Sequence, residues 1–184
     1  PARQPQPMMD GYRGVFGAFP YAFRASDSWL FRSYVVAGAV ATALLAFAFI
    51  LAVVVVFGQT TGMRGGSLTL SRSFVALVGL LSVLPVVAPV LLVARARRRG
   101  EVASPTYEAL LAIGGYAFLL SLYLTAIASM PETFVLDGET VMRPPASGLF
   151  APVISLLYAI PPAASPVVTL PPVGFMATVQ RYYG

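Results

Sequence analysis

Four long stretches without a charged residue dominate this sequence. They cover residues 33–63, 73–94, 109–131 and 144–180. Each contains a run of about 20 apolar residues, the length that a helix needs to cross the hydrocarbon core of a bilayer. A helix in a soluble protein keeps a polar face for water, and these stretches have none. The sequence therefore predicts an integral membrane protein with four spans.

The predicted fold is an all-α membrane protein, a bundle of four transmembrane helices. The helices are placed at about 29–57, 73–95, 104–130 and 147–182. Together they form one transmembrane domain over residues 29–182, preceded at residues 1–28 by a tail and an interfacial amphipathic helix. The mean hydropathy of +0.79 over the chain agrees with this class.

The segment before the first span is aromatic on one side. Tyr12, Phe16, Phe19 and Phe23 recur at helical spacing, which predicts a short helix in the headgroup region that Pro20 ends or bends. Ser26, Asp27 and Ser28 offer N-cap oxygens for the first span. Trp29 and Tyr34 fit an aromatic belt at the membrane surface.

The fourth segment is rich in proline and too long for one straight helix. Residues 148–181 would extend about 50 Å as an α-helix, which exceeds the thickness of the bilayer core. Proline lacks the N–H that a helix interior uses. We therefore expect a helix to about Ile160, a break at Pro161, Pro162 and Pro166, and a second helix from about residue 171 with Thr169 as its cap.

A small β-sheet is predicted to cap the outer ends of the helices. Asp137-Gly138 lies between two β-prone runs at 133–142, which is typical of a two-residue hairpin turn. An alternating run at 67–71 would add a third strand, because an isolated hairpin is only marginally stable. Glu132, Asp137 and Glu139 lack the spacing of an EF-hand, so no metal site is predicted there.

The arginines indicate the orientation. All 12 basic residues are arginine, and nine of them fall on one side of the predicted topology. The positive-inside rule then places both termini in the cytoplasm. The cluster of Arg95, Arg97, Arg98 and Arg99 is predicted to contact lipid headgroups. A docking patch for one specific lipid or for an acidic partner is the alternative.

Two spans carry stripes of small and hydroxyl residues. The stripe of the first span is Gly38, Thr42 and Ala46, and that of the third is Gly114, Ala117, Ser121, Thr125 and Ser129. Small residues let helices approach closely, and hydroxyls hydrogen-bond across the contact. The favoured prediction is that the two stripes pack together. The alternative is a hydroxyl-lined path for a solute or an ion.

The residues that are missing exclude several functions. The chain has no Cys and no His, so it has no disulfide framework and no thiolate or imidazole metal site. No nucleophile–base pair and no ionisable residue at membrane depth is recognised, which argues against an enzyme and against a proton-coupled transporter. No cofactor is expected, and the basic residues beside the spans do not indicate nucleic-acid binding.

Two segments resemble a known family. They are GYRGVFGAFPYAFRASDSWLFR at 11–32, and LDGETVMRPP at 136–145 followed by GLFAP at 148–152. These segments are similar to uncharacterised multi-span membrane proteins of halophilic archaea. The use of arginine in place of lysine and the missing cysteine fit that origin. The resemblance implies location and topology and transfers no functional residue.

The function that these observations favour is a non-catalytic scaffold or accessory subunit of a membrane complex. The alternative is a small transporter or channel component in which Ser121, Thr125 and the break at 161–166 line a path. The expected partners are membrane lipids, with another membrane protein or a second copy of the chain left open.

Overall fold

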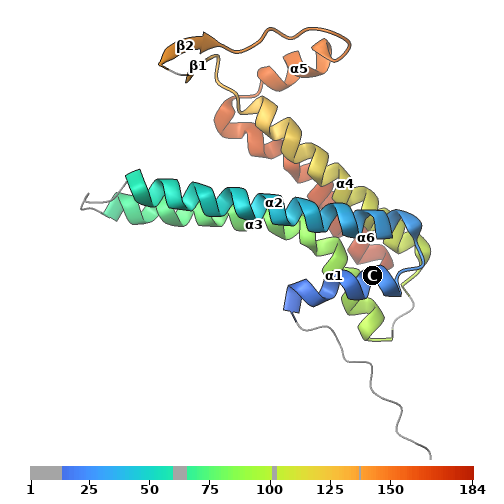
Figure 1. The fold of residues 1–184 in the computed structure, drawn as a ribbon. Helices are drawn as coiled ribbons and strands as arrows, with labels where there is room; N and C mark the ends of the chain where they lie inside the picture. The colour runs from blue at the N-terminus through green and yellow to red at the C-terminus, as the bar shows by residue number, and fades with distance from the viewer. Residues whose placement is uncertain (1–13, 60–65, 101–102, 137) are drawn as a thin grey trace, which may run out of the picture.

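The computed structural model describes residues 14–59, 66–100, 103–136 and 138–184. The chain is mostly helical (Figure 1). In chain order the elements are α1 (Gly14–Ala25), α2 (Trp29–Gln59), α3 (Gly66–Arg98), α4 (Pro105–Ala128), β1 (Thr133–Leu136), β2 (Glu139–Met142), α5 (Ala151–Tyr158), the 3₁₀ helix η1 (Pro162–Thr169) and α6 (Leu170–Tyr183).

Within the described residues, four helical segments are long and apolar enough to cross a membrane. They are Trp29–Gly58, Ser73–Arg98, Pro105–Ala128 and Pro162–Tyr183. The prediction of four spans is therefore confirmed in number, and the first three lie close to the predicted positions. These helices indicate a multi-pass membrane protein.

The fourth span begins later than the predicted residue 147. Helix α5 has only 8 residues, too few to cross, and lies beside the strands (Figure 1). The predicted break at Pro161–Pro166 falls at the start of the 3₁₀ helix η1, which has Pro161 as its N-cap residue, runs from Pro162 to Thr169 and continues into α6. At about 2.0 Å per 3₁₀ residue and 1.5 Å per α residue, the segment Pro162–Tyr183 extends about 37 Å, enough for a core of about 30 Å.

The predicted hairpin is present as a two-stranded antiparallel sheet. Leu136 pairs with Glu139 across a two-residue turn, and Gly138 has a φ of 86°, which favours glycine. Asp137 lies outside the described residues. The predicted third strand at 67–71 is wrong, because these residues belong to α3. Extending an existing helix adds one hydrogen bond per residue without a new nucleus, whereas a lone strand has no partner.

The helices form two pairs that meet at one end (Figure 1). Helix α3 packs along α2, and α4 packs against η1 and α6. The pairs come together where α3 ends and α4 begins, and they diverge from there. We call this meeting point the arginine end, since it carries Arg95, Arg97, Arg98 and Arg99. Helix α1 and the last residue, Gly184, also lie there, whereas the strands and α5 lie at the far end of α4.

The core is concentrated at the arginine end. Its buried residues include Phe31 and Tyr34 of α2, Val86 and Val90 of α3, and Leu111 of α4. Along α2 no residue from 39 to 58 is buried. Helix α3 contains Pro85 and Pro89, and its last part turns away from α2 toward α1 (Figure 1).

Tyr34 lies at the junction of three helices and not in an interfacial belt, so its predicted place is wrong. The side chain is fully buried, and its hydroxyl donates to the carbonyl of Val86. Its ring meets Tyr116 edge-on at 5.2 Å between centroids. Gly115 makes room for this ring, because a Cβ atom there would overlap it. By contrast, the side chain of Trp29 is 81% exposed.

Helix α1 packs on the bundle through its small residues. Ala18 and Ala22 are buried, and the helix contacts α3 and α2. Phe16 is 91% exposed, and Phe23 is also exposed. The helix continues past Pro20 to Ala25. Tyr12, the first residue of the predicted aromatic face, lies outside the described residues.

Candidate functional site

Glu108 is the most unusual residue of the arginine end. It lies in the first turn of α4, and none of its surface is exposed. One carboxylate oxygen, Oε1, accepts hydrogen bonds from Nε and Nη2 of Arg97 at 3.1 and 2.7 Å. The other oxygen, Oε2, accepts from the hydroxyl of Ser26 at 2.7 Å. A buried carboxylate is stable only when charges and donors surround it in this way.

The same carboxylate also closes the start of α2. Its Oε2 atom accepts from the backbone N–H groups of Asp27 and Ser28 at 3.3 and 3.2 Å. The N–H of Phe31 donates to the hydroxyl of Ser28 at 3.3 Å, the N-cap contact expected from the serines. A negative charge near a helix N-terminus is favourable, because the first N–H groups of a helix carry partial positive charge.

Arg97 joins two acids. Besides Glu108, it contacts Oδ2 of Asp27 at 2.8 Å, although Asp27 is largely exposed. We call Ser26, Asp27, Ser28, Arg97 and Glu108 the Glu108 clamp. It links the α1–α2 connection, the end of α3 and the start of α4. The sequence predicts that Arg97 contacts lipid headgroups with its neighbours, whereas the structure gives it two protein partners.

The sequence carried a signal for this clamp that was missed. Glu108 immediately precedes the uncharged stretch 109–131, where it has the position of an ordinary residue at the end of a span. The connection between α3 and α4 is short, and two helices so joined run antiparallel. Such a turn places residues equally far from its centre opposite each other, which would have paired Arg97 with Glu108.

The two predicted stripes do not meet at Gly114. A Cβ atom at Gly114 would contact Met176 and Phe175, which belong to α6, whereas the neighbouring Gly115 faces Tyr34 of α2. Gly38 lies one turn from Tyr34 on the same helix and faces its ring. Within the α4 stripe, Ser121 is buried and Thr125 half-buried, whereas Ala117 and Ser129 are exposed.

The hydroxyl groups of the α4 stripe bond within their own helix. Ser121 donates to the carbonyl of Phe118 at 2.7 Å, and Thr125 donates to that of Ser121 at 2.7 Å. Ser129 donates to the carbonyl of Ala126 at 2.9 Å. None of these bonds crosses to another helix. On α2, the Thr42 hydroxyl oxygen is buried and has no hydrogen-bond partner among the described residues.

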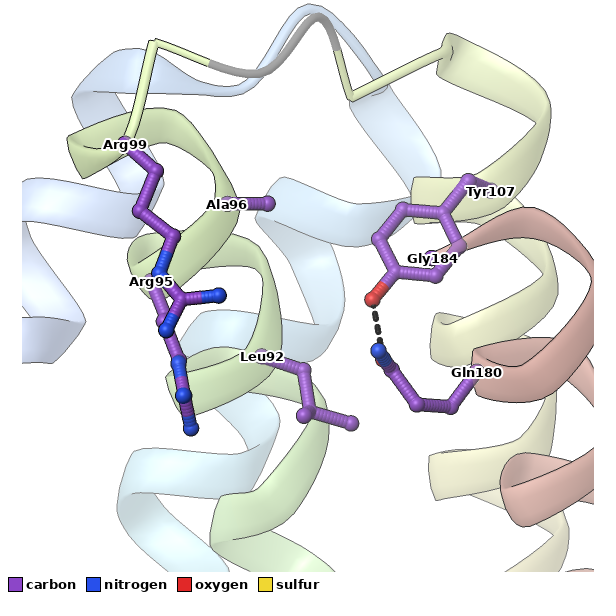
Figure 2. Close-up of a pocket in the computed structure, with 7 residues that line it drawn as sticks. All are labelled: Leu92, Arg95, Ala96, Arg99, Tyr107, Gln180 and Gly184. Atoms are coloured by element: carbon purple, nitrogen blue, oxygen red, sulfur yellow. Dashed lines mark hydrogen bonds between the residues drawn. The ribbon is translucent and has the colours of Figure 1, made fainter.

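Beside the Glu108 clamp lies a polar pocket of about 220 Å³, which we call the arginine notch. Arg95 of α3 and Arg99, which directly follows α3, line one side, and Tyr107 of α4 with Gln180 and Gly184 line the other (Figure 2). The Tyr107 hydroxyl donates to Oε1 of Gln180 and so joins α4 to α6. Arg95, Arg98 and Arg99 are all exposed, and of these Arg98 does not line the notch.

An apolar groove continues from the notch between α3 and α6. It has a volume of about 370 Å³, and it shares Leu92 and Gln180 with the notch. Leu84 and Ala88 of α3 line one wall, and Met176 and Ala177 of α6 line the other. We call it the α3–α6 groove.

The acids of the hairpin region do not gather into a site. Glu132 lies 3.8 Å from Arg143, whose guanidinium group lies 4.1 Å from the ring centre of Tyr158. In the part of the chain that the structure describes, no three acidic, histidine or cysteine residues come together in a way that could hold a metal ion.

Comparison with known proteins gives a family without an assigned activity. No curated protein and no solved structure matches the chain. The family described as "Domain of unknown function (DUF8056)" matches residues 8–184, nearly the whole length. The chain therefore belongs to the DUF8056 family.

Proposed function

We propose that the protein is a non-catalytic scaffold or accessory subunit that binds another membrane helix. The observation that carries this proposal is the contrast along α2. Its first part is held by the Glu108 clamp and the core, whereas none of the residues 39–58 is buried within the chain. Membrane helices associate by side-chain packing. A helix that is held firmly at its first part and exposes the rest of its length is therefore suited to bind a partner helix.

The uncovered face of α2 has the spacing of a helix-packing surface. Exposed apolar residues recur at alternating intervals of four and three, namely Val40, Leu44, Phe47, Leu51 and Val54. This spacing keeps side chains in line along a crossing helix, as in the seam of a coiled coil. The partner is another membrane helix, from a second copy of the chain or from a different protein.

Two observations favour this function over a small transporter or channel component. The hydroxyls of Ser121 and Thr125 bond to carbonyls of their own helix, so they are not directed at a passing solute. Pro161 and Pro162 lie at the start of the fourth span, whereas a helix break that lines a binding site lies near the middle of the membrane.

In this proposal the arginine end faces the cytoplasm. The positive-inside bias and the resemblance to proteins of halophilic archaea support this orientation. Helix α1 then lies at the inner membrane surface, with exposed Phe16 and Phe23 directed to lipid. The hairpin and α5 cover the outer end.

Single cysteines test the proposal cleanly, because the chain contains no natural Cys. In the native membrane, Leu44→Cys, Phe47→Cys and Leu51→Cys would each be labelled with a maleimide that carries a photo-crosslinker. Leu120→Cys and Tyr123→Cys are matched controls, since both residues are exposed on α4. We expect one discrete crosslinked product from the α2 positions, and its mass separates a second copy from a different protein. Equal crosslinking from α2 and α4, or none from α2, would contradict the proposal.

A further inference from the structure

We propose that the arginine notch and the α3–α6 groove together bind one anionic phospholipid. Its phosphate lies against Arg95 and Arg99, and one acyl chain lies in the groove between α3 and α6. This site is separate from the α2 face to which the scaffold function is assigned.

The polar half of the site is suited to a phosphate. Arg95 lies in the last turn of α3, and Arg99, four residues later, directly follows the helix, with its N–H donating to the carbonyl of Arg95 at 3.1 Å; both side chains extend in the same direction (Figure 2). Like charges at this spacing destabilise a helix, and an anion between them reverses that effect. Opposite them, Tyr107 donates to the carboxamide oxygen of Gln180, which leaves the Gln180 Nε2 group as a hydrogen-bond donor.

Arg97 cannot serve this phosphate in the same way. Its guanidinium group is held by Glu108 and Asp27 in the clamp. Among the described residues Arg95 makes no ion pair, and its side chain is exposed at the notch. The notch therefore presents positive charge that the clamp does not neutralise.

The groove and the notch together have about the depth of one leaflet. From Leu84 to Arg95 the groove and the notch follow α3 for eleven residues, which is about 16 Å at 1.5 Å per residue. This is close to half of a hydrocarbon core of about 30 Å. Apart from Gln180 at the shared end, the groove is lined by apolar residues. A free anion would fill only the notch, so the groove points to a lipid.

The first test compares two lipids with identical acyl chains on the full-length protein. Native mass spectrometry in mild detergent would measure retention of phosphatidylglycerol, which is anionic, and phosphatidylcholine, which is zwitterionic. We expect one phosphatidylglycerol per chain and markedly less phosphatidylcholine. At about 1 kcal/mol per arginine near an anionic surface, Arg95→Gln with Arg99→Gln weakens binding about thirty-fold.

The control for charge is Arg98→Gln with Arg181→Gln. This variant removes the same charge from α3 and α6, but neither residue lines the notch or the groove. We expect its retention of phosphatidylglycerol to stay within about threefold of wild type. An equal loss in both double variants would mean general attraction to an acidic surface and would overturn the proposal.

The second test fills the groove. Ala177→Phe places a ring where the acyl chain is proposed to lie, and Ala126→Phe makes the same change on an exposed face of α4. We expect only Ala177→Phe to lose the lipid. Ala88→Phe on the opposite wall replaces it if Ala177→Phe does not elute as a single folded species.

Unchanged lipid retention in a folded groove variant would overturn the proposal. So would displacement of phosphatidylglycerol by millimolar inorganic phosphate, since that would show a site for a free anion.

Discussion

Replacing Glu108 should separate the three elements that meet at the arginine end. In Glu108→Ala, Arg97 loses two hydrogen bonds to Oε1, and Ser26, Asp27 and Ser28 lose their common acceptor Oε2. Removal of one partner from a buried ion pair costs about 3–5 kcal/mol. Arg97 keeps Asp27 at 2.8 Å and is 20% exposed, so we expect the lower end, about 3 kcal/mol of unfolding free energy.

The assay uses the only tryptophan of the chain. Trp29 follows Ser28 directly and is exposed, so its fluorescence reports on the start of α2. Equilibrium unfolding would be followed in mixed micelles with an increasing fraction of sodium dodecyl sulfate. The matched control is Glu132→Ala, since Glu132 is 85% exposed and faces Arg143 at 3.8 Å. We expect the control to change the free energy of unfolding by no more than about 0.5 kcal/mol.

Two further variants test the mechanism of this effect. Glu108→Gln keeps the shape and one acceptor oxygen but removes the charge, so we expect a loss of about half that of Glu108→Ala. Arg97→Ala combined with Glu108→Ala should destabilise by less than the sum of the single changes, because neither charge is then left buried alone. If Glu108→Ala costs no more than Glu132→Ala, the clamp does not hold the arginine end together.

Two more predictions concern packing and topology. Gly115→Ala should destabilise the protein by about 1–3 kcal/mol, because the new methyl group would overlap the buried ring of Tyr34. Gly174→Ala, which has open space around its Cβ position in α6, should be neutral or stabilising in the same unfolding assay, and an equal effect of both would contradict this packing. Thr106→Cys and Thr140→Cys, both exposed, should react with an impermeant maleimide from opposite sides of the membrane, with Thr106→Cys reactive only after permeabilisation. Labelling of both from one side would refute the topology.

The spans could be read from the sequence because their signal is local. An uncharged run of sufficient length leaves few alternatives to a membrane helix, and the hairpin turn at Gly138 is equally local. The start of the fourth span is harder to predict from the sequence. The segment just before Pro161 is even more apolar than the segment after it, and only the short length of α5 and its place at the far end of α4 show that the crossing begins after Pro161.

Contacts between distant residues could not be read in this way. Tyrosine is a residue type typical of an interfacial aromatic belt. The burial of Tyr34 depends instead on its contact with Gly115 of α4. The hydroxyls of the α4 stripe suggested bonds between helices, but a serine or threonine in a helix always has a carbonyl of its own preceding turn within reach. The notch depends on α3 and α6, which are far apart in sequence, lying side by side next to α4.

The Glu108 clamp also sets an order of assembly. During synthesis the connection before α2 and the end of α3 are made first, and Glu108 follows 80 residues after Ser28. Until that glutamate arrives, the N–H groups of Asp27 and Ser28, just before α2, lack their carboxylate acceptor, and Arg97 has only the exposed Asp27. The first two membrane helices are therefore an unfinished unit, and the arrival of the third completes it.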